Sequence, residues 1–318
     1  MLTDTKLRNL KPRDKLYKVN IAANGFGPGN AAGSRRPVIA ATVHNKDPAM
    51  SCACGQNHNH APPLVLGGEE IPLERPLVSL SGRLICKDAA QMLLALDLLT
   101  EHAELSRAEP GNLRFDLAQA EDPLVWELNE LYADEAAFQA HRDRLKDSRW
   151  GRESHGIQRD FTRSEPMPRL RAEMAHDRAA VSELLACAFD GPAEARLVEA
   201  LRADDDLALS LVAEAEGTVI GHVALSPLKA EGPALALAPL AVHPAVQSRG
   251  IGEALTRAAL AAFDDHTIVV LGDPAYYGRF GFAPADLDSP YAGPHLMALG
   301  PELPAGSRIA HAQAFAGL

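Results

Sequence analysis

Cysteine, aromatic residues and long apolar runs are all scarce in this chain of 318 residues. The four cysteines, Cys52, Cys54, Cys86 and Cys187, are too few and too unevenly spaced for a disulfide framework, so we expect reduced thiols. No apolar run approaches the roughly 20 residues that cross a bilayer, and the first residues lack the apolar core of a signal peptide. We therefore expect a cytoplasmic protein with no membrane partner.

Positive charge is also short, because 31 lysines and arginines stand against 42 aspartates and glutamates. Nucleic-acid-binding proteins usually present a basic face, so this balance argues against a nucleic-acid partner and favours a small-molecule substrate. The 47% hydrophobic content is enough for two cores in a chain of this length. We therefore expect two domains.

Residues 1–76 are rich in glycine, proline and asparagine and show little hydrophobic periodicity. This composition predicts a mostly irregular segment. Residues 2–19 resemble the start of the arm-binding domain of phage-type tyrosine integrases. Nothing later in the chain resembles the catalytic domain of that family, so the resemblance does not imply DNA binding.

Four side chains that can bind metals lie close together in this first segment, at Cys52, Cys54, His58 and His60. Such a set could close a tetrahedral zinc or copper site. The spacing is not that of a zinc finger, in which a longer segment separates the two ligand pairs. We favour a polar loop without metal, and a metal-binding loop is the alternative.

Residues 77–163 predict one compact domain of alternating strands and helices. Residues 78–85, 112–118 and 125–132 alternate as strands, and residues 156–161 can form a last one. Two aspartates are placed to cap the intervening helices, Asp88 and Asp134. The resulting order, βαββαβ, is the ferredoxin-like plan.

The same domain resembles the antibiotic biosynthesis monooxygenase family, in residues 106–115 and 130–141. The resemblance implies a homodimer formed through the sheets, and some family members oxidise quinol-like or polycyclic aromatic substrates without metal or flavin. It also implies a candidate site at Asn129 and His141. The second histidine that the family often has soon after this position is absent, and His141 can instead pair with a carboxylate, either Glu109 or Glu130.

Residues 164–168 predict a linker because they contain two prolines, and residues 169–318 predict a second, mixed α/β domain. Asp177 precedes a helical pattern with apolar residues on one face, and a second helical stretch lies near residues 193–201. Strands are predicted at residues 209–214, 219–225, 234–242 and 268–272. The whole chain is therefore expected to be α+β.

A glycine turn connects the strand at 234–242 to a predicted helix. Gly250 and Gly252 leave room for a ligand, and the unpaired amides of the helix's first turn favour an anion. The spacing is neither that of a Walker loop nor that of a Rossmann fingerprint. An ordinary glycine turn that starts a helix is the alternative interpretation.

With Tyr277 and the following Phe280-Gly281-Phe282, this turn resembles the GNAT acyltransferase superfamily. There the Gln/Arg-x-x-Gly-x-Gly/Ala turn holds the acyl-CoA pyrophosphate, and a tyrosine four residues before the Gly-Phe pair often protonates the departing thiolate. The resemblance implies an acetyl-CoA-dependent N-acetyltransferase acting on a small-molecule amine, with Tyr277 as the acid. The implied acetyl-CoA contacts are Leu240, Ala241, Val242, Gln247, Ser248, Arg249, Gly250, Ile251 and Gly252.

The general base stays open at this point, because His222, His243 and Glu214 all lie near strand ends and family members often use water chains instead. Three hypotheses follow. The first is an acetyltransferase whose ferredoxin-like domain mainly dimerises. The second is a bifunctional acetyltransferase and cofactor-free monooxygenase acting on an aromatic or antibiotic-like compound. The third is a non-catalytic sensor of CoA or metal.

Overall fold

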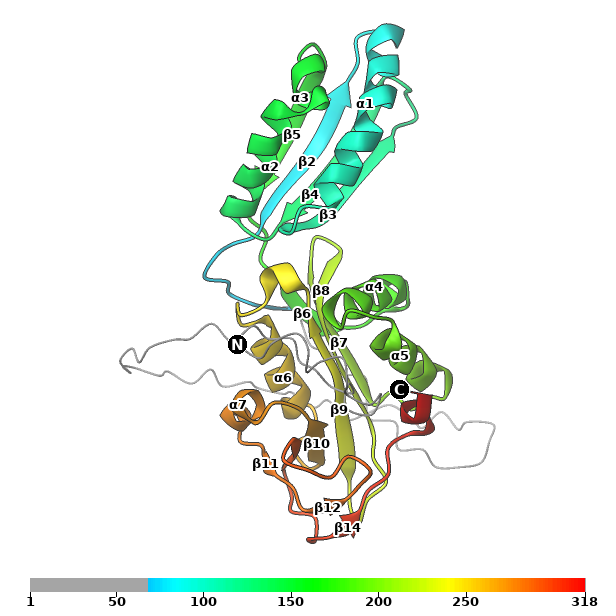
Figure 1. Ribbon diagram of the computed structural model, residues 1–318, viewed down its shortest axis with the longest axis vertical. Coiled ribbons are helices and arrows are strands. Elements are labelled where there is room, and N and C mark those ends of the chain that lie inside the picture. The colour runs from blue at the N-terminus through cyan, green and yellow to red at the C-terminus, as the bar shows by residue number, and fades with distance from the viewer. Residues whose placement is uncertain (1–67, 318) are drawn as a thin grey trace, which may run out of the picture.

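Two main sheets organise residues 68–317, the part of the chain that the computed structural model describes (Figure 1). A four-stranded sheet in the order β3-β4-β2-β5 forms a small domain, at the top of Figure 1. An eight-stranded sheet in the order β1-β6-β7-β8-β9-β10-β13-β11 forms a large domain below it. The expected α+β class with two domains is therefore observed.

The small domain follows the predicted βαββαβ order, with one short additional helix, α3, before the last strand. Asp88 and Asp134 cap the two long helices, because their side chains accept hydrogen bonds from the amides of Gln91 and Ala137, each at 3.0 Å. The elements are β2 Val78–Ile85, α1 Ala89–Arg107, β3 Asn112–Gln119, β4 Val125–Tyr132, α2 Glu135–Asp147, α3 Arg149–Glu153 and β5 Gln158–Ser164.

The large domain places helices on both faces of its sheet. Helices α4 and α5 cover one face through a core that includes Val181, Leu185 and Val212, whereas α6 covers the other face through Ile251 and Leu255. The elements are β6 Arg169–Ala172, α4 Arg178–Ala188, α5 Ala193–Ala203, β7 Leu209–Ala215, β8 Thr218–Pro227, β9 Ala234–Val242, α6 Ile251–Ala261, β10 Thr267–Leu271 and α7 Pro274–Tyr277.

Several short strands escape the sequence patterns. Strand β1 (Glu69–Glu70) pairs with β6 at one edge of the large sheet, and β13 (Leu296–Leu299) pairs with β10 and with β11 (Ala283–Pro284) at the other. A separate two-stranded sheet joins β12 (Leu287–Asp288) to β14 (Ser307–Arg308). Strands of two to four residues are too short to show a period of two, so only their partners reveal them.

The two domains touch through the turn between β7 and β8. Glu216 at this turn accepts a hydrogen bond from Ser79 Oγ at 2.5 Å, and its backbone carbonyl accepts one from Arg114 at 2.5 Å. Leu77 and Leu131 of the small domain are buried in the same apolar cluster as the α6 side of the large domain. The domains therefore share a packed contact.

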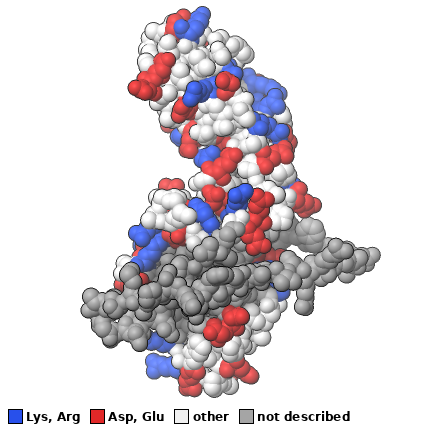
Figure 2. All heavy atoms as spheres, turned by 180° about the vertical axis from the view of Figure 1, so that it is seen from behind, with Lys and Arg blue, Asp and Glu red and all other residues white. Residues whose placement is uncertain are grey.

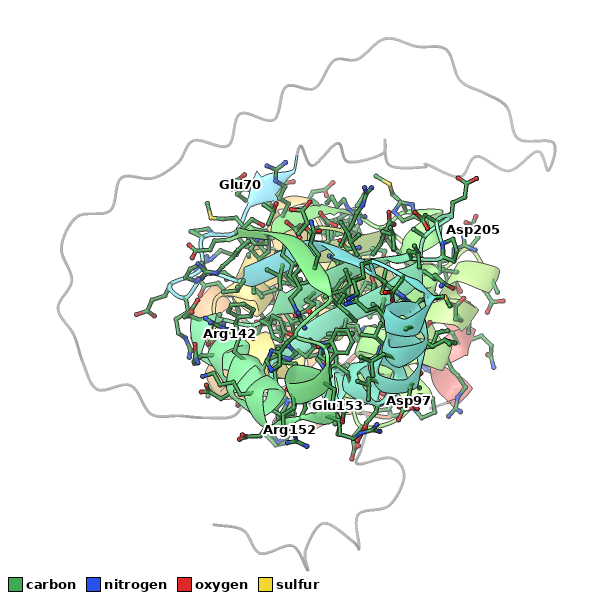
Figure 3. All side chains as sticks on the ribbon, turned by 90° about the horizontal axis from the view of Figure 1, so that it is seen from above. Glu70, Asp97, Arg142, Arg152, Glu153 and Asp205 are labelled. Atoms are coloured by element: carbon green, nitrogen blue, oxygen red, sulfur yellow. The ribbon has the colours of Figure 1, made fainter. Side chains whose placement is uncertain are left out.

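Charged side chains are mostly at the surface. Both signs are interspersed over the face of the molecule that Figure 2 shows. In Figure 3, six labelled side chains lie at the outside of the ribbons: Glu70, Asp97, Arg142, Arg152, Glu153 and Asp205. The charged groups that are buried instead are therefore the ones to consider as functional.

Candidate functional site

The strands β9 and β10 part at the middle of the large sheet. They pair in parallel over three positions, from Thr267 opposite Ala234 to Val269 opposite Ala236. Beyond these positions β9 continues to Val242, while β10 is paired on its other side with β13. The parting leaves the second half of β9 without β10 as a neighbour.

Two backbone amides of β9 are directed toward this parting. The amide of His243, just after the strand, donates to Ile220 O of β8 at 2.9 Å. Amides alternate in direction along an antiparallel strand, so those of Leu240 and Val242 point away from β8. The structure therefore places the two predicted amides where a ligand could meet them.

A bulge in β9 lies beside these amides. The register pairs Leu225 with Leu237 and Val223 with Leu240, which leaves Ala238 and Pro239 opposite one residue of β8. Bulges bend a strand, and a proline is tolerated there because it has no amide to pair. The bend and the parting of β9 from β10 thus occur together.

The turn after β9 has a strained backbone. Ser248 and Gly250 adopt positive φ angles of 60° and 89°. Gln247 braces the turn, because its side-chain amide donates to Val242 O at 3.1 Å. Gly250 is the N-cap of α6, and no side chain among the described residues caps this helix. The first-turn amides of α6 are therefore available to an anion.

The two glycines of the turn serve different purposes. Gly250 supplies the left-handed conformation, and a Cβ there would meet no atom within 4 Å. A Cβ at Gly252 would lie 3.0 Å from the Tyr276 hydroxyl oxygen and 3.5 Å from Val242 Cγ2. A side chain at Gly252 would therefore press on the Tyr276 hydroxyl, so this glycine bears on the packing of Tyr276 against α6 as well as on the ligand space that the sequence suggested.

Arg249 is held by the small domain. Its guanidinium donates to Ala133 O, to Asp134 Oδ2 at 2.8 Å and to Ala245 O at 3.2 Å. The side chain is 7% exposed. Of the residues predicted to contact CoA, Arg249 is the one whose side chain already has protein partners in another domain.

Tyr277 is buried at the end of α7, which begins after an N-cap at Asp273. Its ring packs edge-on against Phe282, with 5.5 Å between the ring centroids. A Cβ at Gly272 would lie 2.3 Å from Tyr277 Cε2, so glycine there admits the ring. Burial raises the pKa of the Tyr277 hydroxyl, which stays protonated at neutral pH.

The three candidates for the general base either face the α4/α5 core or accept hydrogen bonds from backbone amides. His222 is fully buried, and it pairs across the sheet with Val212 and Ala241, which belong to the α4/α5 core. Burial lowers the pKa of His222, although Glu173 opposes this shift. His243 Nδ1 accepts from the Ala245 amide at 3.3 Å, and burial lowers its pKa too.

Glu214 accepts from the Gly217 amide at 2.7 Å, within the turn between β7 and β8. Arg171 lies 3.9 Å from the same carboxylate. These contacts stabilise the hairpin, so Glu214 has a structural role in the turn. The contacts of His222, His243 and Glu214 therefore identify none of them as the general base.

In the small domain, His141 lies between two carboxylates, those of Glu109 and Glu130, which were predicted from the sequence as its alternative partners. Its Nδ1 is 2.9 Å from Glu109 Oε2, and its Nε2 is 3.8 Å from Glu130 Oε2. Arg144 Nε donates to the other oxygen of Glu109 at 2.5 Å. Burial raises the pKa of Glu130, although His141 and the Tyr132 hydroxyl oppose this shift.

Asn129 does not join this cluster. It neighbours Glu130 on β4 and therefore points to the opposite face of the sheet, where it is exposed. His102, which the sequence did not single out, does join, with its ring centroid 5.7 Å from that of His141. Burial lowers the pKa of His102 to about 3. Its position on the apolar face of α1 hid it among core residues.

Two further expectations concern ligands and membranes. The metal-ligand set at Cys52, Cys54, His58 and His60, like the integrase-like start, lies outside the described residues. Within residues 68–317 no group of three or more His, Cys, Asp or Glu side chains could hold a metal ion. No helix in that part of the chain is long and apolar enough to span a membrane.

Two family models match parts of this chain. Residues 178–282 match the model of the Acetyltransferase (GNAT) family, and residues 86–146 match that of Antibiotic biosynthesis monooxygenase. The uncharacterized N-acetyltransferase YhbS of Escherichia coli K12 is 41% identical over 120 residues, which cover 36% of this chain and 72% of YhbS.

Two further proteins are similar to this chain. The uncharacterized N-acetyltransferase YjhQ of Escherichia coli K12 is 36% identical over 129 residues, which cover 37% of this chain and 71% of YjhQ. A crystal structure of a GNAT family acetyltransferase from Brucella melitensis in complex with acetyl-CoA is 36% identical, with a TM-score of 0.40. It covers 46% of this chain and 96% of that protein.

Proposed function

The chain belongs to the GNAT family of N-acetyltransferases, and we propose that it transfers the acetyl group of acetyl-CoA to a small-molecule amine at the parting of β9 and β10. One observation carries the proposal: the half of β9 that has no β10 neighbour leads, through the turn at residues 243–250, into a helix, α6, whose first turn has no side-chain cap. A strand with free amides followed by a free helix N-terminus suits a long ligand that ends in phosphates.

The residues present fit acetyl-CoA. The amides of Leu240 and Val242 would hold the pantetheine arm and the thioester carbonyl, and the first-turn amides of α6 would hold the pyrophosphate. Acetyl-CoA supplies an activated acetyl group. Amides that are already aimed at the carbonyl oxygen stabilise the negative charge that develops on it, without rearranging during the reaction.

Tyr277 is the general acid in this proposal. The departing sulfur needs a proton, and burial keeps the Tyr277 hydroxyl protonated by raising its pKa. The packing of its ring against Gly272 and Phe282 holds the side chain in one orientation. No residue is assigned as the base, because His222 faces the α4/α5 core and His243 and Glu214 hold backbone amides.

The small domain mainly dimerises in this proposal. Its sheet carries α1, α2 and α3 on one face (Figure 1). Among the described residues, the other face contacts the large domain through Ser79, Arg114 and Leu131, and its remaining part would meet a second copy. A mass measurement of the full chain in solution tests this. A monomer would contradict it.

Monooxygenase activity is the second candidate function, and the buried cluster around His141 favours it. Glu109, Glu130 and His141 could take up a proton away from water, and His102 adds a neutral imidazole beside them. Oxygen uptake with a panel of quinols tests it. A non-catalytic sensor of CoA is the third, and it would bind CoA without turnover.

The deciding experiment measures CoA release over a panel of amines for wild type, Tyr277→Phe and Tyr276→Phe. Loss of a general acid commonly costs about 100-fold or more in rate, so kcat should fall by that factor in Tyr277→Phe, with the KM for acetyl-CoA unchanged. The Tyr276 hydroxyl lies 3.5 Å from Thr256 Oγ1 and packs on α6, so Tyr276→Phe should keep its rate.

Two outcomes would contradict the proposal at different levels. An unchanged rate in Tyr277→Phe would remove Tyr277 as the acid but leave the transferase. If calorimetry detected no saturable binding of CoA to wild type, the acetyltransferase proposal itself would be wrong.

A further inference from the structure

The turn at residues 247–250 is anchored both within its own domain, where Gln247 donates to Val242 O, and from the small domain, which holds Arg249. Ser248 and Gly250, both with positive φ, flank Arg249. The Arg249 guanidinium is bonded to Ala133 O and Asp134 Oδ2 of the small domain, residues more than a hundred positions earlier in the chain. The residue at the centre of the turn is therefore fixed by a neighbouring domain.

Asp134 links two elements through its two oxygens. Its Oδ1 accepts from the Ala137 amide at 3.0 Å and so caps α2, while its Oδ2 accepts from Arg249 at 2.8 Å. Arg75, which is largely exposed, lies 3.3 Å from the same Oδ2. The Asp134 side chain is 12% exposed, so little solvent screens its pairing with Arg249.

A turn that is already ordered binds its ligand more tightly than one that must first be ordered. Fixing the backbone of a flexible residue costs conformational entropy, and a flexible turn would take this cost from the free energy of binding. The turn at residues 247–250 lacks a side-chain cap for α6, and Ser248 adopts a left-handed φ of 60° that costs energy for a residue other than glycine. The bonds from Ala133 and Asp134 to Arg249 therefore help to order the turn before CoA binds.

We propose that Asp134 is a positioning residue for acetyl-CoA: by holding Arg249, it makes the small domain part of the acetyl-CoA site. The proposal rests on the proposed function, because it takes the turn before α6 as the pyrophosphate site. It gives the domain fusion a purpose within the acetyltransferase reaction, separate from dimerisation and from any oxidation. Asp134 itself touches neither the amine nor the thioester.

Two matched variants separate this role from simpler ones. Asp88 caps α1 as Asp134 caps α2, but α1 begins at the end of the small domain that lies away from the large domain (Figure 1), so Asp88→Asn tests the loss of a cap's charge alone. Glu216 joins the two domains through Ser79 and Arg114 and, among the described residues, makes no hydrogen bond to the turn at residues 247–250, so Glu216→Gln tests a weakened domain contact alone.

The experiment is a calorimetric titration of the full chain with CoA, for wild type, Asp134→Asn and the two controls. Asparagine is as good a cap as aspartate, so α2 should be retained while the charge that holds Arg249 is lost. We expect the Kd for CoA to rise about tenfold in Asp134→Asn, since ordering the backbone of one residue on binding costs a factor of about this size in affinity. Asp88→Asn and Glu216→Gln should stay within about twofold.

The titration distinguishes a loss of folded protein from a change in the CoA site. Partial unfolding lowers the binding stoichiometry, whereas the Kd reports the site in the folded molecules. An unchanged Kd in Asp134→Asn would overturn the inference while leaving the acetyltransferase in place. An equal rise in either control would also overturn it, because a cap or a domain contact would then explain the effect. Absence of CoA binding in wild type would refute the proposed function first.

Discussion

Replacing Glu173 by glutamine tests the buried polar cluster on the α4/α5 side of the large sheet. Glu173 Oε1 accepts from Arg202 at 2.5 Å, its Oε2 accepts from Ser210, and His222 Nε2 lies 3.6 Å away. The side chain is 6% exposed. Burial alone would raise the pKa of Glu173, but the contacts with His222, Arg202 and Ser210 and the charge of Arg202 outweigh it and lower the pKa from 4.5 to about 2.

The size of the effect follows from that pKa. At about 1.4 kcal/mol per unit of pKa, the carboxylate contributes about 3 kcal/mol to the free energy of unfolding at neutral pH. Removing one partner of a buried ion pair costs a similar amount, about 3–5 kcal/mol. Because the folded pKa is depressed, this contribution is complete above the unfolded pKa and is lost as pH falls from about 4.5 toward 2.

Urea unfolding followed by far-UV circular dichroism measures the effect, since both tryptophans, Trp126 and Trp150, lie in the small domain. Glu199→Gln is the control, because Glu199 pairs with the same Arg202 at 2.6 Å but is 49% exposed. An exposed pair contributes about 0–1 kcal/mol. The argument fails if Glu173→Gln is no less stable than Glu199→Gln, or if its deficit is the same at pH 7 and at about pH 3.5.

Two glycine pairs test the geometry of the site. Gly250→Ala places a side chain at a φ of 89°, and its control, Gly306→Ala, does so at a φ of 74° elsewhere in the chain. No atom lies within 4 Å of either added Cβ, so each variant should lose about 1 kcal/mol of stability from its backbone conformation alone. Only Gly250→Ala should weaken CoA binding in calorimetry, and equal binding by the two would contradict the turn's role. Gly272→Ala should push the Tyr277 ring aside and lower kcat for CoA release, whereas Gly278→Ala meets no atom within 4 Å and should not. A normal rate in a folded Gly272→Ala would show that the orientation of Tyr277 does not matter.

Local patterns predicted much of the fold. The caps at Asp88 and Asp134 are recognisable because a capping side chain and the amides that it accepts from lie within one turn of each other. The strand at 234–242 and the glycines after it are recognisable for the same reason. The short strands β1 and β13 could not be recognised from sequence, because the strands that pair with them, β6 and β10, lie far from them in the chain.

In the candidate site, too, local sequence predicted some features, and others depend on contacts between distant residues. Tyr277 could be named from its spacing to Gly281 and Phe282, but its burial and its dependence on Gly272 could not. His222 was a reasonable base from sequence until the sheet register placed it on the α4/α5 face.

The sequence by itself determined the two domains, their order and the turn that opens α6, because each of these depends on neighbours a few residues apart. Only the tertiary structure decided that Arg249 of this turn is bonded to Asp134, which lies 115 positions away. It also decided that Asn129 turns away from His141. Contacts of this kind depend on strand register and on the packing of one domain against another, and no local pattern encodes either of them.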